Sequence, residues 1–200
     1  MLIKDDLLQN TAIYLNGPPS VGKDTIGLLF DQNHGSTLSA FKNSLIEITL
    51  AIYNISHDNF IKLYESKELP CPEFNGLSPR EALIFVSEEV IKPKFGNAFF
   101  GSRTALSIPP KNIERYGVTL TDCGFAPEIN QVVKIHPQAI HILVRLHRNG
   151  LTYKNDSRSY IPDEDFKGDY ALDVYLPDGP SKAALKVLRA IQKLPIGIAS

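Results

Sequence analysis

The sequence predicts a single α/β domain with a mostly parallel central sheet flanked by helices. Two observations predict it. Short apolar runs alternate with longer amphipathic stretches, as expected for parallel strands joined by crossover helices. A glycine-rich segment, residues 17–25, also follows the first apolar run and precedes the first helical pattern. A strand, a glycine-rich loop and a helix in this order form a common phosphate-binding unit of α/β proteins.

Apolar periodicity and chain-breaking residues define the expected elements along the chain. The expected strands are 12–16, 36–39, 117–121, 139–146 and 171–176. The expected helices are 23–31, 41–53, 58–64, 79–91 and 181–193. The polar segments 66–78 and 149–168 are expected to be loops, because they are rich in residues that favour turns.

The helix expected at 79–91 has the clearest boundaries. Ser78 is a favourable N-cap, Pro79 suits the first helical position, and Glu81 completes a capping box. Pro93 is expected to end the helix, because the residue before a proline disfavours helical backbone angles.

Composition excludes several classes of protein. The chain has 200 residues, a net charge of −1 and 43% hydrophobic residues, so no basic tail or stripe suits a nucleic-acid backbone. Cys71 and Cys123 lack the spacing of a zinc site or a redox pair and fit a reducing cytoplasm. No apolar run is long enough to span a bilayer, and the acidic N-terminus does not resemble a signal peptide. We therefore expect a soluble cytoplasmic protein.

The segment from Gly17 to Thr25 matches the pattern G-x-x-x-x-G-K. Gly17 and Gly22 allow a tight turn that directs backbone N–H groups at phosphate oxygens, and Lys23 supplies a positive charge. Asp24 stands where Ser or Thr usually binds magnesium. The expected nucleotide-binding residues are Gly17, Pro18, Ser20, Val21, Gly22, Lys23, Asp24 and Thr25. A glycine turn before a helix, without a ligand, is the alternative.

Two further charged residues suit a phosphate site. Asp122 ends an apolar strand at the sheet edge where the glycine-rich loop is expected, so its carboxylate could bind magnesium directly or through water. Capping of a turn with Gly124 is the alternative. Arg80 lies in the first turn of a helix, where a cation gains nothing from the helix dipole. Either an anionic ligand or simple exposure to solvent explains it.

The late polar loop, about 147–168, is a candidate lid. Arg145 and Arg148 flank its start, and Lys154 and Arg158 lie within it. Phosphoryl transfer requires cations near the moving group and exclusion of water, which a closing basic loop supplies. An ordinary solvated loop is the alternative.

Aromatic and histidine side chains are weaker candidates. Phe41 and Phe125 could stack on a base, although core packing is the usual role of such residues. His136 and His141 are expected to have no catalytic role, because the five histidines lack metal-ligand spacing.

Taken together, these residues resemble the P-loop deoxynucleoside monophosphate kinases of large phages and their bacterial relatives. The similarity covers most of the chain in order. The matching segments are G-x-x-x-x-G-K-D-T at 17–25, Ala40-Phe41 before a helix, S-P-R-E-A-L at 78–83, V-T-L-T-D-C-G-F-A-P-E at 118–128 and D-V-Y-L-P-D-G at 173–179.

The resemblance implies a P-loop fold, with an acceptor-binding helical region at about 40–100, and ATP-dependent phosphorylation of a (deoxy)nucleoside monophosphate with Mg²⁺. By motif, Lys23 would bind the terminal phosphates of ATP, and Asp24 with Asp122 would form the metal environment. The catalytic set would be Lys23, Asp122, Arg145 and Arg148, with the two arginines acting from the lid. The acceptor-binding set would be Phe41, Arg80, Gly124 and Phe125.

Two departures from the family pattern concern the acceptor. Many relatives have Asp-x-Arg-Phe where this chain has Asp122-Cys123-Gly124-Phe125, so an arginine is missing at Gly124. The helix after Phe41 also differs from the common Ala-Asp-Pro-Leu-Lys. The resemblance implies nucleotide partners, and relatives often form homodimers. A P-loop kinase of another acceptor, such as a small metabolite or a modified base in DNA, and a non-catalytic nucleotide-binding regulator are the alternatives.

Overall fold

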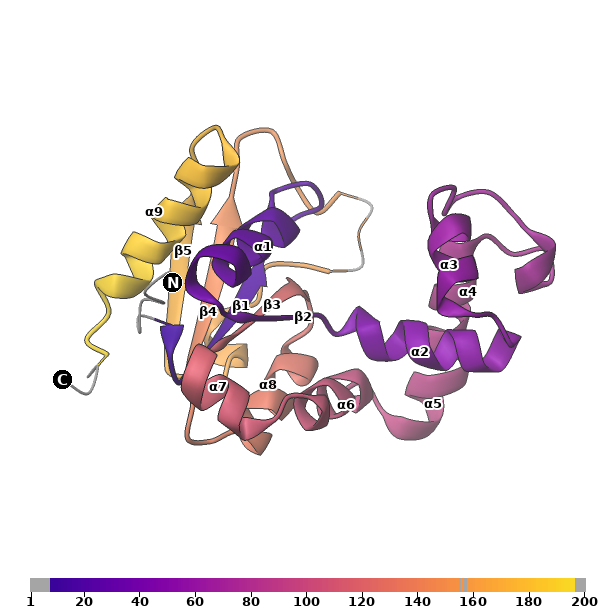
Figure 1. Ribbon diagram of the computed structural model, residues 1–200, viewed down its shortest axis with the longest axis horizontal. Coiled ribbons are helices and arrows are strands. Elements are labelled where there is room, and N and C mark those ends of the chain that lie inside the picture. The colour runs from indigo at the N-terminus through magenta and orange to yellow at the C-terminus, as the bar shows by residue number, and fades with distance from the viewer. Residues whose placement is uncertain (1–7, 155, 157, 197–200) are drawn as a thin grey trace.

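The central element of the protein is one five-stranded sheet in the order β2-β3-β1-β4-β5, with every neighbouring pair parallel (Figure 1). The fold comes from a computed structural model that describes residues 8–154, 156 and 158–196. The strands are β1 (Thr11–Asn16), β2 (Thr37–Ser39), β3 (Val118–Cys123), β4 (Ile140–His147) and β5 (Tyr170–Tyr175). The predicted α/β class and the flanking helices are confirmed.

Helices connect these strands and cover both faces of the sheet. The α-helices are α1 (Lys23–His34), α2 (Lys42–Tyr53), α3 (His57–Tyr64), α4 (Pro79–Phe85), α5 (Lys92–Phe95), α6 (Phe99–Ser107), α7 (Pro110–Tyr116), α8 (Ala126–Ile135) and α9 (Pro180–Gln192). The π-helix η3 spans Val86–Ile91, and two short 3₁₀ helices are η2 (Pro72–Phe74) and η4 (Asp163–Asp165). In the described part of the chain, no helix is long and apolar enough to cross a membrane.

Strand β1 lies at the centre of the sheet, and all six of its residues are buried. Its side chains alternate between two hydrophobic clusters, as the period of a strand requires. Ile13 and Leu15 join the cluster formed with α1 and α9. Ala12 and Tyr14 join the cluster formed with α6, α7 and α8. The sheet is therefore covered on both faces. The place left for a ligand is the edge formed by the carboxyl ends of the strands, where parallel sheets bind their ligands.

The segment from α2 to α5 forms a helical arm that extends away from the sheet (Figure 1). The arm has an apolar cluster of its own, in which Phe60, Phe74 and Ala82 are buried. The predicted capping box at the start of α4 is confirmed: the Ser78 hydroxyl accepts from the Glu81 N–H at 3.2 Å, and the Glu81 carboxylate accepts from the Ser78 N–H at 2.8 Å.

The predicted end of this helix before Pro93 is wrong. Helix α4 ends at Phe85, the π-helix η3 follows, and α5 then continues through Pro93 in its first turn. The intervening π-helix shifts the helix register, so the chain changes helical type where the sequence pattern suggested a stop.

Candidate functional site

The glycine-rich segment forms the loop between β1 and α1. Ser20 (φ 63°) and Gly22 (φ 111°) both have left-handed backbone conformations, which is uncommon for a residue other than glycine. A Cβ atom on Gly17 would lie 2.9 Å from the Leu146 carbonyl oxygen, so the loop requires glycine there. No side chain caps α1, and its first N–H groups face the loop without intrahelical partners. This backbone has the form of an anion-binding turn.

The Lys23 side chain lies inside this loop. It is 8% exposed, and its ammonium donates to the carbonyl oxygens of Gly17 at 2.5 Å and Pro18 at 2.8 Å. Burial, together with the nearby positive charge of Arg158, lowers the pKa of Lys23 to about 8. The two carbonyl groups offer the ammonium only partial negative charges. A phosphate group bound in the loop would offer it a full negative charge.

Asp24 lies beside the loop, at the carboxyl edge of the sheet. One carboxylate oxygen accepts from the Thr121 hydroxyl at 2.7 Å, which joins the start of α1 to β3. The close approach of α1 to β3 requires Gly27, because a Cβ atom there would lie 2.4 Å from the Thr121 methyl carbon. Asp24 therefore has a defined position next to the anion-binding turn, as an exposed carboxylate.

Asp122 lies at the same edge, as the sequence predicted, but it also has a structural partner. Its two carboxylate oxygens accept from the N–H groups of Phe41 and Lys42, both at 2.8 Å. Burial raises the pKa of Asp122, and these two N–H groups oppose that effect. The carboxylate therefore links β3 to the first turn of α2, and not to a turn with Gly124. The sequence did not reveal this contact, because about 80 residues separate its partners.

The residues that could bind Mg²⁺ fit a site completed by nucleotide phosphates. Among the described residues, no group of three or more His, Cys, Asp or Glu side chains could hold a metal ion. Mg²⁺ usually keeps several waters and uses one or two carboxylates together with substrate phosphates. Asp24 suits that role because one of its oxygens makes no hydrogen bond to a described residue. A role for Asp122 in metal binding stays a prediction.

Asn16, which sequence analysis did not single out, attaches the late polar loop to the end of β1. Its side chain is fully buried. The amide nitrogen lies 2.9 Å from the Cys123 carbonyl oxygen and 3.0 Å from both the Tyr153 hydroxyl and the Ser159 carbonyl oxygen, so its two N–H groups are shared among three acceptors. The amide oxygen accepts from the Ile161 N–H at 3.1 Å. The middle of the lid-like loop is therefore anchored beside the phosphate loop. The only signal in the sequence was a polar residue directly before the glycine-rich motif.

Arg158 extends from this anchored loop across Gly124. A Cβ atom on Gly124 would lie 2.3 Å from Arg158 Cδ and 2.4 Å from Cγ. The guanidinium donates to both oxygens of Asp156, with Nε at 2.8 Å and Nη2 at 2.7 Å. The Arg158 side chain is 25% exposed. The predicted acceptor-side position Gly124 is therefore occupied by the stem of an arginine from elsewhere in the chain.

A buried carboxylate lies next to this region, on the first turn of α8. Glu128 is 6% exposed, and burial together with the negative charge of Asp122 raises its pKa to about 8. Lys92 and Arg158 lower the pKa but do not outweigh burial. The Lys92 ammonium lies 4.8 Å from the ring centroid of Phe125, a cation–π contact. Phe125, a predicted acceptor-binding residue, is thus half-buried and paired with a cation.

The two predicted lid arginines are engaged in other contacts. Arg145 Nε and Nη2 donate to Asp173 at 3.1 and 2.7 Å, and Nη1 donates to Asp163 and the Ile161 carbonyl. Arg148 lies 3.6 Å from Asp178. No contact in the described residues brings either guanidinium to the phosphate loop, so their catalytic role stays a prediction.

The predicted acceptor residues Phe41 and Arg80 lie in different surroundings. The Phe41 ring is 3% exposed and packs in the cluster under α6 and α8, so core packing explains it. Arg80 lies in the helical arm, where its half-exposed guanidinium pairs with Glu68 at 2.7 Å. Its contact with an acceptor stays a prediction.

The two histidines that we expected to be non-catalytic are buried and paired. His136 Nε2 lies 2.8 Å from the Ala105 carbonyl oxygen. His141 Nδ1 lies 2.8 Å from the Tyr14 hydroxyl, and its Nε2 lies 2.9 Å from the His136 carbonyl oxygen. These contacts are consistent with structural roles.

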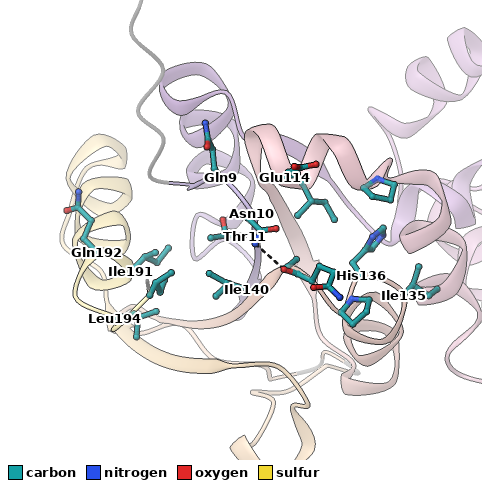
Figure 2. A pocket seen from close by; sticks show the side chains of 16 residues that line it. Gln9, Asn10, Thr11, Glu114, Ile135, His136, Ile140, Ile191, Gln192 and Leu194 are labelled. Carbon is teal, nitrogen blue, oxygen red and sulfur yellow. Dashed lines mark hydrogen bonds between the residues drawn. The ribbon is translucent and has the colours of Figure 1, made fainter. Parts of the chain in front are cut away.

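A cavity of about 890 Å³ lies at the other end of the sheet, beside the amino ends of β1 and β4 (Figure 2). Figure 2 shows Thr11 and Ile140, at the amino ends of β1 and β4, together with Ile191 and Leu194 from the C-terminal region. Ligands of parallel sheets bind beyond the carboxyl ends of the strands, so this cavity is separate from the phosphate loop.

Comparison with known proteins does not assign a family. No family model matches the sequence, and no curated protein matches it either. Among solved structures, the chain is similar to a gluconokinase from Sinorhizobium meliloti 1021, with 12% identity, coverage of 92% of each chain and a TM-score of 0.43. A likeness at this level assigns no activity, so the function must be argued from the site.

Proposed function

We propose that this protein is an ATP-dependent phosphotransferase, and that its acceptor is a (deoxy)nucleoside monophosphate. The observation that carries the proposal is the turn between β1 and α1. It combines two left-handed residues, an uncapped helix start and a buried lysine whose ammonium, among the residues that the structure describes, donates only to loop carbonyl groups. That set matches the β- and γ-phosphates of a nucleotide.

The donor would be held by main-chain N–H groups and by Lys23. Lys23 would leave the carbonyl oxygens of Gly17 and Pro18 for phosphate oxygens. Mg²⁺, when bound with ATP, would neutralise charge on the β- and γ-phosphates, and we propose that the exposed carboxylate of Asp24 would help to hold it. The protein would act mainly by positioning and electrostatic stabilisation, with little covalent chemistry.

The acceptor is proposed to lie on the α2 side of the phosphate loop. Asp122 attaches the start of α2 to β3, so the helical arm begins directly at the ligand edge of the sheet. Phe125 follows Asp122 by three residues and has the Lys92 ammonium over its ring, so this side of the sheet offers an aromatic ring and a cation that is also paired with Glu88. A nucleoside monophosphate has a phosphate that suits the cation and a base that suits the aromatic ring. The resemblance described above favours this acceptor over a small metabolite.

The test is production of ADP from ATP and Mg²⁺ by the purified protein, with separate (deoxy)nucleoside monophosphates, small hydroxylated metabolites and oligonucleotides as acceptors. We expect at least one monophosphate to stimulate turnover, and Lys23→Ala to reduce kcat/KM by a factor of at least about 10². Lys111→Ala is the control, because Lys111 is exposed on α7, away from the phosphate loop.

Other results of this assay, combined with a direct measurement of ATP binding, would change the proposal. Stimulation by a metabolite or an oligonucleotide alone would retain the phosphotransferase and reject the nucleotide acceptor. Tight ATP binding with no turnover on any acceptor would favour a nucleotide-binding regulator. A Lys23→Ala variant with unchanged turnover would reject the phosphate loop as the donor site.

A further inference from the structure

We propose that Arg158 is a catalytic residue that contacts the terminal phosphoryl group of the bound donor, and that Gly124 is glycine because it makes room for this arginine. The inference rests on the proposed function, and it assigns a role to a residue pair that neither the motif nor the comparisons identify. Three independent features of the structure support it.

The first feature is steric. A Cβ atom on Gly124 would lie within 2.3 to 2.8 Å of three successive carbon atoms of Arg158, namely Cδ, Cγ and Cβ. Because the near end of the side chain is included, rotation of the guanidinium alone cannot relieve the contact. Gly124 has no left-handed φ value that would itself require glycine. The requirement at this position therefore comes from the arginine.

The second feature is electrostatic. Arg158 is close enough to Lys23 to be the second largest influence on that lysine, after burial, and to lower its pKa. Two cations in one partly buried region repel each other unless an anion lies between them. Asp156 neutralises Arg158 through a forked contact. Within the described part of the chain, the Lys23 ammonium donates to carbonyl oxygens, and Asp24 and Asp156 are near enough to raise its pKa without offsetting burial and Arg158. The terminal phosphate of a nucleotide in the loop would face both cations.

The third feature is the support of the loop. Asn16 binds the Ser159 carbonyl and the Ile161 N–H, which lie on the C-terminal side of Arg158. The Asp156 carboxylate also accepts from the Arg158 N–H at 2.9 Å. The segment that follows Arg158 is thus held in place by hydrogen bonds, which lowers the entropy lost when the guanidinium binds a phosphate. Asp156 is the positioning residue, because it sets the direction of the guanidinium.

A guanidinium is well suited to this position. Its planar fork binds two phosphate oxygens at once, and it stays charged at any pH that the protein experiences. Transfer of the phosphoryl group from ATP to an acceptor breaks the bond to the β-phosphate oxygen and forms one to the acceptor oxygen. Negative charge on the leaving ADP and on the group in transit would be stabilised by Arg158 and Lys23.

The test compares the affinities of ATP and ADP, measured by calorimetry without acceptor, for the wild type and four variants. Arg158→Ala should weaken ATP binding by roughly tenfold more than ADP binding, since only ATP has the terminal phosphate. Gly124→Ala should have the same effect by displacing Arg158. The double variant should lose no more of the preference for ATP over ADP than either single variant, because both changes remove the same contact. Arg103→Ala, an exposed arginine on α6, should have no effect.

Several results would overturn the proposal. Equal weakening of ATP and ADP, additive losses in the double variant, or unchanged affinities would show that Arg158 does not contact the terminal phosphate. A structural role would instead lower Tm in Arg158→Ala without selective loss of ATP. If Gly124→Ala does not fold, Arg158→Lys provides the deciding measurement. Lysine keeps the charge but loses the planar fork, so the preference of Arg158→Lys for ATP over ADP should lie between those of the wild type and Arg158→Ala.

The two proposals fail in different ways. If ATP is preferred over ADP through Arg158 but no acceptor stimulates turnover, the phosphotransferase proposal fails and the assignment of Arg158 stands. If turnover occurs and Arg158→Ala retains the full preference for ATP and a wild-type kcat, only the assignment of Arg158 fails. If neither nucleotide binds the wild type, both fail.

Discussion

Replacement of Glu128 by glutamine should stabilise the protein at alkaline pH and have little effect at acidic pH. Glu128 is 6% exposed, and its pKa is raised to about 8. Burial is the main cause. The charged groups around it are Asp122 and Glu88, which raise the pKa, and Lys92 and Arg158, which lower it. Glutamine has nearly the same shape as the protonated acid but cannot ionise.

The sign and size follow from proton linkage. Between the ordinary value of 4.5 and about 8, the folded chain holds a proton that the unfolded chain has lost. The Glu128 contribution to the free energy of unfolding therefore falls as the pH rises through this window, by about 1.4 kcal/mol per pH unit at most. The complete window corresponds to about 4 to 5 kcal/mol. Water entry around the ionised group reduces this, so we expect Glu128→Gln to gain about 2 to 4 kcal/mol between pH 5 and pH 8.5.

The assay is urea unfolding followed by circular dichroism at several pH values, for the wild type, Glu128→Gln and Glu114→Gln. Glu114 is exposed on α7 and controls for loss of a carboxylate at the surface. The quantity of interest is the difference in unfolding free energy between variant and wild type, in which other titrating groups cancel. A difference for Glu128→Gln that is constant from pH 5 to pH 8.5 would refute the reasoning.

Four other outcomes are expected. Because the pKa of Lys23 is lowered to about 8 in the free protein, ATP binding at pH 8.5 should take up a proton, and affinity should fall above pH 8; calorimetry in two buffers of different ionisation enthalpy would detect this. Asn16→Ala leaves buried partners unsatisfied and should cost about 2 to 4 kcal/mol of unfolding free energy, with faster proteolysis in the late loop. Asp122→Asn presents an amide N–H to a backbone N–H and should cost about 1 to 3 kcal/mol in urea unfolding. Gly27→Ala should lower Tm, since its Cβ atom would lie 2.4 Å from the Thr121 methyl carbon.

The sheet and its phosphate loop could be predicted because their signals are local. The buried run 12–16, followed by glycines and Lys23, specifies a strand, a turn and a helix within about twenty residues. Helices α6, α7 and α8 had no comparable signal. Two of them begin with a proline near their first position, which also suits a loop.

The details of the site could not be predicted, because they depend on contacts between distant segments. Gly124 is separated from Arg158 by 34 positions, and Asp122 from Phe41 by 81. Hydrophobic periodicity reports which face of an element is buried, but not which polar side chain meets it there. The absence of an arginine at Gly124 therefore looked like a loss until the fold placed Arg158 over it.

The π-helix η3 determines which way Lys92 faces. Each turn of a π-helix holds one more hydrogen-bonded residue than an α-helical turn, and each residue of an α-helix advances by about 100°. If Val86–Ile91 became regular α-helix with no change in chain length, each residue would turn the chain further, and Lys92 would rotate away from the Phe125 ring. Removal of one residue together with the return to α-helix would instead leave Lys92 facing the same way. Substitutions that change the helical type of this segment are thus a route by which the cation at the proposed acceptor side could be exchanged for a different side chain, with the sheet left unaltered.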